Sequence, residues 1–148
     1  FEIKYNEIQL TIKEELIENY INNKFLPPKK DELYSMVKGE KSEIDQVLNS
    51  LISNGDIIRL DDEIYLYKTT YEEALKILKE YIDEKDSITV AEYRDALGTN
   101  RKVALSLLEH FDQLKITKRD GDKRTLFWDV GRFLVLEWYY GDKNNRYK

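Results

Sequence analysis

The sequence predicts a mainly α chain with small β-hairpins (α+β), arranged as two tandem winged-helix units, each a helix-turn-helix followed by a two-stranded wing. Three observations predict this fold. Apolar residues recur every three or four positions, which is typical of amphipathic helices. Two extended stretches surround polar turns, as in β-hairpins. The order of these features repeats after about sixty residues.

The first unit is expected over residues 1–68 and begins with helices. An apolar stripe marks the first helix, which Pro27-Pro28 follows, and proline restricts the residue before it and lacks a backbone donor. Asp and Ser residues suited to capping precede the next two apolar patterns. The helices are therefore expected at Thr11–Asn23, at Glu32–Val37 with Asp31 as cap, and after Ser42 as cap, ending near Gly55.

A hairpin closes the first unit around Asp61-Asp62, with strands expected at Asp56–Leu60 and Glu63–Lys68. The pattern that leads into it recurs later in the chain with a gap of one residue. The corresponding positions are Leu48, Leu51 and Ile57 in the first unit and Leu108, Phe111 and Ile116 in the second.

The second unit is expected over residues 69–127, after a boundary near Lys68–Thr70. Its first helix is predicted over Tyr71–Ile82. A short helix over Val90–Leu97 follows, with Ser87 or Thr89 as cap and Gly98 as the residue that ends it, since glycine takes the left-handed conformation at low cost. The next helix starts after Thr99 or Asn100, with Val103, Leu107, Leu108 and Phe111 on its apolar face, and a hairpin of Lys115–Arg119 and Lys123–Phe127 turns at Asp120-Gly121.

Charge is unevenly distributed along the chain. The net charge is −5, but residues 1–84 carry −8, residues 85–127 carry +2 and residues 128–148 carry +1. Because charges in solution are screened over a Debye length of about 8 Å, a basic region can attract phosphate although the whole chain is acidic. The alternative for a basic hairpin is that it simply carries solvated side chains. The cations of this region are Arg101 and Lys102 at a helix start and Lys115, Lys118, Arg119, Lys123 and Arg124 on the hairpin.

The run ITVAEYRDALGTNRKVALSLLEHFD followed by ITKRDGDKRTL resembles the last winged helix of the bacterial selenocysteine-specific elongation factor, SelB. That family has G-T-[ST]-R-K after an R-D-x-L helix and a basic G-D-x-R wing; Asn100 departs from the expected small hydroxyl residue. The resemblance implies binding to the selenocysteine insertion (SECIS) hairpin of mRNA through backbone phosphates and an extruded loop base. The RNA-binding residues expected on this basis are Arg94, Thr99, Asn100, Arg101, Lys102, Lys118, Arg119, Asp120, Gly121, Lys123 and Arg124.

The resemblance also implies partners of a longer parent protein. The chain begins at Phe1 without a Met, so we expect it to be a piece of such a protein. GTP would bind a domain absent from this chain, and the ribosome and selenocysteyl-tRNA would bind through the parent protein. We expect no cofactor in the chain itself, a monomer, and a cytoplasmic location.

The first wing and the C-terminal segment carry different signals. The tip of the first wing is acidic, Asp61-Asp62-Glu63, so the first unit is interpreted as a spacer or protein-facing unit. A few phosphate contacts through Lys38 and Lys41 stay open as the alternative. The C-terminal extension, residues 128–148, is apolar enough to form an extra strand or helix over the core, with base stacking by Trp138, Tyr139 or Tyr140 as the alternative.

The sequence offers no pattern for catalysis, a metal or a membrane span. It has no Cys, and its one His, His110, adjoins Phe111 on a core-forming helix, where a structural role is expected. Gly39-Glu40-Lys41-Ser42 lacks the order of a phosphate loop. No stretch approaches the roughly twenty apolar residues that span a bilayer. Two alternatives remain open: a winged helix that regulates transcription on DNA and one that binds protein.

Overall fold

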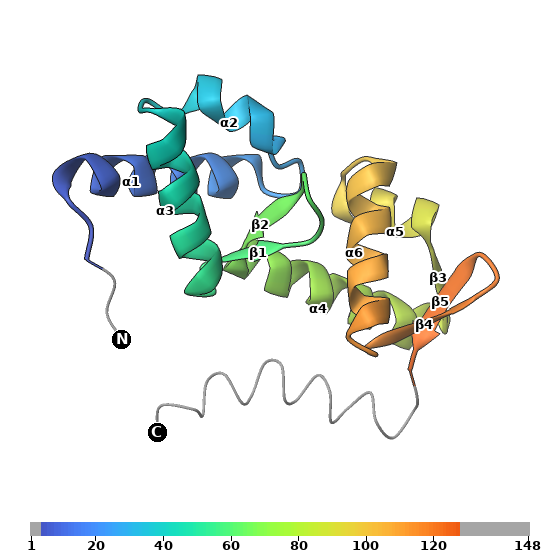
Figure 1. Cartoon of the computed structure of the whole chain (residues 1–148). Coiled ribbons are helices and arrows are strands. Elements are labelled where there is room, and N and C mark those ends of the chain that lie inside the picture. The colour runs from blue at the N-terminus through green and yellow to red at the C-terminus, as the bar shows by residue number, and fades with distance from the viewer. Residues whose placement is uncertain (1–3, 128–148) are drawn as a thin grey trace. The chain divides into compact units, whose positions relative to one another are not determined.

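The computed structural model describes residues 4–127 (Figure 1). It is mainly helical with two small antiparallel sheets, which confirms the predicted fold class. The chain divides into two compact units, Phe1–Tyr71 and Glu72–Lys148, here called unit 1 and unit 2. The predictions for residues 128–148 lie outside the described residues.

Unit 1 contains three helices and a two-stranded wing. Its core gathers apolar side chains from all three helices and both strands, among them Ile12, Leu16, Leu33 and Leu48. The elements are α1 (Glu7–Asn23), α2 (Lys30–Met36), α3 (Lys41–Ser53), β1 (Ile57–Arg59) and β2 (Tyr65–Tyr67), and Lys68 opens the following helix.

Helix starts in unit 1 differ from the predictions. The Asn6 side chain accepts a hydrogen bond of 2.8 Å from the Gln9 backbone N–H, and so α1 begins four residues before the predicted start at Thr11. The predicted caps Asp31 and Ser42 are wrong. Lys29 and Glu40 occupy the cap positions without a side-chain cap bond, so that Asp31 and Ser42 lie inside the first turns.

Helix α4 (Lys68–Lys85) begins in the last residues of unit 1 and continues as the first helix of unit 2. Helix α5 (Val90–Leu97) has the predicted bounds: Thr89 caps it by accepting a hydrogen bond of 3.1 Å from the Glu92 N–H, and Gly98 ends it at a φ of +70°. Asn100 caps α6 (Arg101–Gln113) by accepting a bond of 2.9 Å from the Val103 N–H.

The wing of unit 2 is a three-stranded sheet in the order β3-β5-β4. The strands are β3 (Ile88–Thr89), β4 (Thr117–Asp120) and β5 (Lys123–Leu126). The two-residue strand β3 was not predicted. Asp120 pairs with Lys123, so the loop is Gly121-Asp122, one residue later than predicted.

The internal repeat is confirmed, and the predicted gap is wrong. Helices α3 and α6 both have 13 residues and start sixty positions apart, at Lys41 and Arg101. The turn that follows is also equivalent: the Asp56 N–H donates to the Leu51 carbonyl at 2.9 Å, and the Ile116 N–H donates to the Phe111 carbonyl at 3.0 Å. Residues of the two units therefore correspond at a constant offset of sixty from Lys41 to at least Asp56.

Candidate nucleic-acid interface

A hollow of about 440 Å³ lies in unit 2 where α6 faces the wing and the start of α5. We call it the unit 2 hollow. Figure 1 shows α6 beside the sheet that contains β4 and β5. The side chains around the hollow are mostly charged or small. They are Thr89, Val90, Ala91, Arg101, Leu105, Glu109, Arg119, Asp122 and Arg124.

Helix α6 contributes one stripe of residues to the hollow. Arg101, Leu105 and Glu109 are spaced four apart, and residues at this spacing lie on the same helix face. Arg101 occupies the first turn, where backbone N–H groups have no partner within the helix and favour anions. Its side chain is exposed and makes no hydrogen bond or ion pair within residues 4–127. The guanidinium of Arg101, which has no partner among the described residues, thus lies at one rim of the hollow.

The wing contributes a second exposed guanidinium, that of Arg119. Its Nε donates a hydrogen bond of 2.8 Å to the carbonyl of Gly121 in the hairpin loop. This bond uses one of the five donors of the guanidinium and fixes its direction. The predicted convergence of cations from a helix start and a hairpin therefore occurs for Arg101 and Arg119, which line the same hollow.

Arg124 differs from the prediction that it contacts RNA. Its side chain is only 3% exposed, and its Nε and Nη2 each lie 3.2 Å from Asp112 on α6. The other oxygen of Asp112 accepts a hydrogen bond of 2.6 Å from the Thr117 hydroxyl. Because the guanidinium is buried and paired, the prediction that Arg124 contacts RNA is corrected. Arg124 connects the wing to α6 through its ion pair with Asp112.

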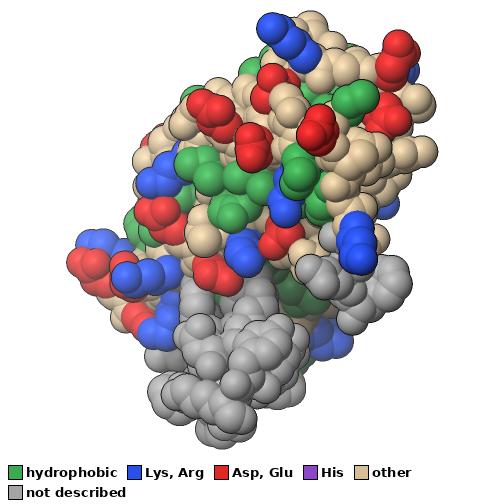
Figure 2. Space-filling model, turned by 90° about the vertical axis from the view of Figure 1, so that its left-hand side faces the viewer, with side chains coloured by type: hydrophobic (Ala, Val, Ile, Leu, Met, Phe, Trp, Pro, Cys, Tyr) green, Lys and Arg blue, Asp and Glu red, His purple; other side chains and the backbone are tan. Residues whose placement is uncertain are grey.

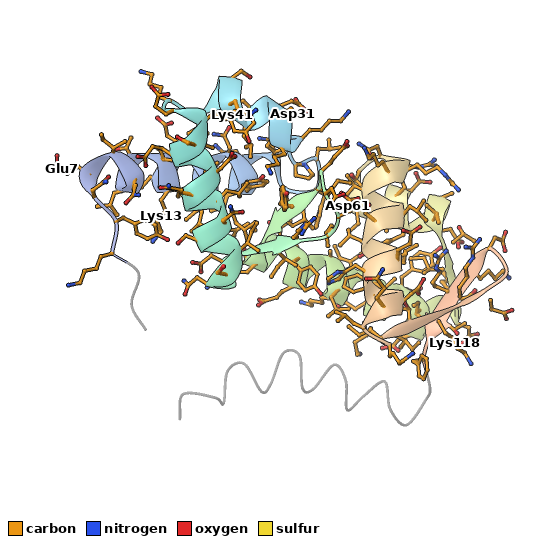
Figure 3. All side chains as sticks on the ribbon, viewed as in Figure 1. Glu7, Lys13, Asp31, Lys41, Asp61 and Lys118 are labelled. Carbon is orange, nitrogen blue, oxygen red and sulfur yellow. The ribbon has the colours of Figure 1, made fainter. Side chains whose placement is uncertain are left out.

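Lys118 and Lys123 start from the opposite face of the hairpin. Side chains alternate along a strand, so Lys118 points away from the face of Arg119. Lys123 is the cross-strand partner of Asp120 and lies beside Thr89 of β3. Both lysines are exposed, and Figure 3 labels Lys118 on the wing. The wing cations are thus divided between two faces and do not form one surface.

Lys123 also adds to the electrostatic environment of Glu92. The backbone hydrogen bond from Thr89 lowers the pKa of the Glu92 carboxyl most, followed by the hydrogen bond from the Tyr81 hydroxyl. The nearby positive charge of Lys123 lowers the same pKa further. A small network thus joins α4, α5 and β5 at the outer side of the wing.

The other predicted site residues do not line the hollow. Arg94 forms an ion pair of 3.0 Å with Asp95. The side chain of Asn100 is committed to the cap of α6. Thr99 is half-buried before α6, and Lys102, Asp120 and Gly121 are exposed.

Six residues that line the hollow, in three groups, were missing from the predicted site. Thr89, Val90 and Ala91 reach it through the unpredicted pairing of β3 with β5. Leu105 and Glu109 could have been found, because they follow Arg101 at the spacing of one helix face. Asp122 was missed because the hairpin loop is Gly121-Asp122, one residue later than predicted.

Unit 1 has a hollow of about 450 Å³ between α3 and its own wing. Two cations of unit 1 that correspond to the arginines of the unit 2 hollow have local partners. Arg59, the residue sixty positions before Arg119, forms an ion pair with Asp62. The Lys41 ammonium, equivalent to Arg101, lies 4.8 Å from the ring centre of Tyr34. Arg101 and Arg119 of unit 2 thus have no acidic partner among residues 4–127, whereas in unit 1 Arg59 pairs with Asp62 and Lys41 lies over the Tyr34 ring.

Residues 4–127 contain no cluster of three or more His, Asp or Glu side chains able to hold a metal ion. Burial lowers the pKa of His110, whose ring packs edge-on against Phe111 with 5.8 Å between centroids. Within the same described range, no helix is both long and apolar enough to cross a bilayer.

A known protein family matches the part of the chain that contains the second wing and its hollow. The family model for the winged helix of elongation factor SelB matches residues 80–126, which include every residue of the unit 2 hollow. The chain is homologous to the C-terminal winged-helix region of SelB. The predicted resemblance is therefore confirmed.

Curated relatives agree with this homology. The selenocysteine-specific elongation factor of Desulfomicrobium baculatum is 30% identical over 84 residues, covering 57% of this chain and 13% of the relative. That of Haemophilus influenzae is 34% identical over 65 residues, covering 44% and 10%. The alignments thus span about a tenth of the length of these SelB relatives.

Solved structures share the fold. The mRNA-binding domain of Escherichia coli SelB, solved in complex with SECIS RNA, superposes with a TM-score of 0.71 at 23% identity and covers 82% of this chain and 98% of that domain. A bacterial selenocysteine-specific elongation factor superposes with a TM-score of 0.59 at 19% identity, covering 82% of this chain and 18% of that one. The tandem winged-helix plan is therefore common to both.

Proposed function

We propose that unit 2 binds a structured RNA hairpin, the SECIS element of an mRNA, with the unit 2 hollow as the centre of the site. The observation that carries the proposal is that Arg101 and Arg119, from two different elements, line one hollow. In this proposal both guanidinium groups bind backbone phosphates, because planar guanidinium donors match phosphate oxygens. Lys102, Lys118 and Lys123 add contacts to phosphates further away.

The hollow suits an extruded loop base. Its volume of about 440 Å³ lies in the range of small-ligand sites, roughly 300–1,000 Å³. Leu105 offers an apolar contact to a base face, and the carboxylates of Glu109 and Asp122 can accept hydrogen bonds from base amino groups. Carboxylates would weaken a site that binds phosphate alone, so their presence supports a base between the two arginines.

RNA fits this surface better than duplex DNA. A helix that reads DNA presents its side chains to base edges in the major groove. Here the stripe of α6 that begins with Arg101 faces the wing across the hollow and continues to Glu109. Structured RNA is recognised through its backbone and through unpaired bases, which needs only a cationic rim and a pocket.

The parent protein is part of the same proposal. We infer a selenocysteine-specific translation elongation factor in the cytoplasm, in which GTP and selenocysteyl-tRNA bind other domains and the ribosome binds through the whole protein. The present chain then acts as a monomeric RNA-binding module without catalysis or cofactor. Unit 1 serves as a spacer or protein-facing unit, which is supported by the ion pair of Arg59 with Asp62 and by the contact of Lys41 with the Tyr34 ring.

One titration tests the RNA proposal against its alternatives. Fluorescence anisotropy would compare a SECIS-type RNA hairpin, the same hairpin with altered loop bases, and duplex DNA. Tight binding to the first alone is expected. Equal binding to all three would contradict specific RNA recognition, equal binding to the two RNAs would contradict a base pocket, and no binding would favour a protein-interaction role.

Arg101→Ala and Arg119→Ala test the two arginines. Each change should weaken hairpin binding about tenfold and reduce the salt slope by about one, since one phosphate contact is lost. The equivalent residues of unit 1 give matched controls. Lys41→Ala and Arg59→Ala should leave both values nearly unchanged, and equal losses in both units would show that the site is not confined to unit 2.

A further inference from the structure

The outer face of α1 in unit 1 carries two parallel rows of side chains. Residues seven and eleven apart lie close to whole numbers of helical turns, so each row runs along the helix axis. The apolar row includes two exposed large hydrophobic residues, Leu10 at 43% and Ile21 at 48%. The rows are Leu10, Ile17 and Ile21, and beside them Glu7, Glu14 and Glu18; together they are called the α1 outer face.

The apolar row borders the buried face of the helix. Ile12, Leu16 and Tyr20 are buried in the core, and Ile17 is half-buried against the same core. The row of carboxylates lies further out, about 60° around the helix from the apolar row and on the side opposite the buried residues. A partner that covers the apolar row would therefore meet the carboxylates along one edge.

The carboxylates of the α1 outer face are available. Glu7, Glu14 and Glu18 are exposed, and none of their carboxyl groups has a hydrogen bond or ion pair within residues 4–127. Figure 3 labels Glu7 at the start of α1. Unit 1 as a whole is acidic, since residues 4–71 contain 13 Asp and Glu against 9 Lys and Arg. On the face drawn in Figure 2, a patch of apolar side chains is bordered by both acidic and basic ones.

We propose that the α1 outer face docks an amphipathic helix of a partner protein that carries an apolar row and a parallel row of Lys or Arg. The apolar rows would be buried against each other, and the cations would pair with Glu7, Glu14 and Glu18. The distance from Leu10 to Ile21 is about 16 Å along the axis, so roughly three turns of the partner suffice.

Charge excludes the other common occupants. RNA phosphates and anionic lipids would be repelled by the row of carboxylates. A basic amphipathic helix satisfies both rows at once.

The test uses the full chain and a labelled helical peptide whose Leu residues recur at i, i+7 and i+11 beside a row of Lys. We expect binding that weakens with salt, and no binding of the same peptide with Glu in place of Lys. The double variant Leu10→Gln/Ile21→Gln should weaken binding about tenfold. Both side chains are exposed, so the circular dichroism of the variant should match that of the original chain.

Ile8→Gln is the matched control. Ile8 is 64% exposed on the same helix but lies on the other side of the buried face. Binding by this variant should be unchanged. Glu14→Lys/Glu18→Lys should abolish the interaction with the Lys peptide and permit binding of the Glu peptide.

Several outcomes would overturn the proposal. Equal affinities for the Leu10→Gln/Ile21→Gln variant and the Ile8→Gln control would remove the α1 outer face from the contact. Stronger peptide binding after deletion of residues 128–148 would make the chain's own C-terminal segment the natural occupant. A dimer that dissociates on Leu10→Gln would make the occupant a second copy, and competition by the RNA hairpin would place the peptide at the unit 2 site.

Discussion

Arg119 and Arg124 are cross-strand partners in the wing, yet their guanidinium groups have opposite environments. Arg119 is exposed and bound through Nε to a loop carbonyl, whereas Arg124 is buried against Asp112. The sequence alone does not distinguish the two arginines, because the partner of Arg124 is Asp112, which lies twelve residues earlier on a helix. Residue type therefore predicted the cationic wing, and only the tertiary pairing shows which arginine is free for a ligand.

Asp112 should contribute strongly to the stability of unit 2. Asp112→Ala leaves the buried Arg124 charge and the Thr117 hydroxyl without their partner, and unpaired buried charges are costly. We expect a loss of about 2–3 kcal/mol in the free energy of unfolding, measured by urea denaturation. Asp62→Ala, which removes an exposed pair with Arg59, should cost less than about 1 kcal/mol. Similar costs for both variants would contradict the structural role of Asp112.

Tyr20 is a second residue with a testable energetic role. Its hydroxyl is buried in the core of unit 1 and has no hydrogen-bond partner among residues 4–127, and burial raises its pKa well above the ordinary value. A buried donor without a partner loses its hydration without compensation. Tyr20→Phe should therefore keep or raise the free energy of unfolding, by up to about 1 kcal/mol. A clear decrease in a urea titration would show that the hydroxyl has a partner.

At the scale of elements, local signals predicted the fold where capping chemistry defines an end. Thr89 and Gly98 set the bounds of α5, and both were identifiable from the sequence. The starts of α2 and α3 were missed because Lys29 and Glu40 are not typical caps. Strand β3 has only two residues and exists through its pairing with β5, which no local pattern indicates.

The network at the start of α5 should make stability depend on pH. Hydrogen bonds from the Thr89 backbone and from Tyr81 lower the pKa of Glu92, so the folded state binds a proton less readily than the unfolded state. Its stabilising effect is therefore present above the unfolded pKa of about 4.3 and is lost as the pH falls through the lower folded value. Glu92→Gln should lower the melting temperature at pH 7 and have little effect near pH 2.

Glu80→Gln on α4 is a suitable comparison for that measurement. Glu80 is exposed and has no hydrogen bond or ion pair within residues 4–127. Its substitution should leave the pH dependence of the melting temperature unchanged. A Glu92→Gln curve that runs parallel to the original at every pH would mean that the carboxylate contributes nothing through its ionisation.

At the scale of the whole molecule, one structural repeat carries two different charge arrangements. Lys41 and Arg59 of unit 1 occupy the positions of Arg101 and Arg119 in unit 2, but a tyrosine ring and Asp62 hold them locally. The sequence predicted this division through the acidic tip of the first wing. It could not predict which cations converge, because the face of each wing residue depends on strand register. The hollow and its non-cationic lining needed the structure.

The acidity of unit 1 should then direct RNA to unit 2. Glu14→Lys/Glu18→Lys adds a cationic surface to a chain whose net charge is −5, in a region remote in sequence from Arg101. Because phosphate attraction is largely independent of sequence, affinity for a hairpin with altered loop bases should rise several-fold at about 50 mM salt, while affinity for the cognate hairpin changes little. The ratio of the two affinities should therefore fall.

At about 200 mM salt most of this difference should disappear, since the added attraction is screened. The neutral pair Glu14→Gln/Glu18→Gln should give an intermediate ratio, and a ratio that stays constant in all three proteins would show that the charge of unit 1 has no part in selecting the RNA.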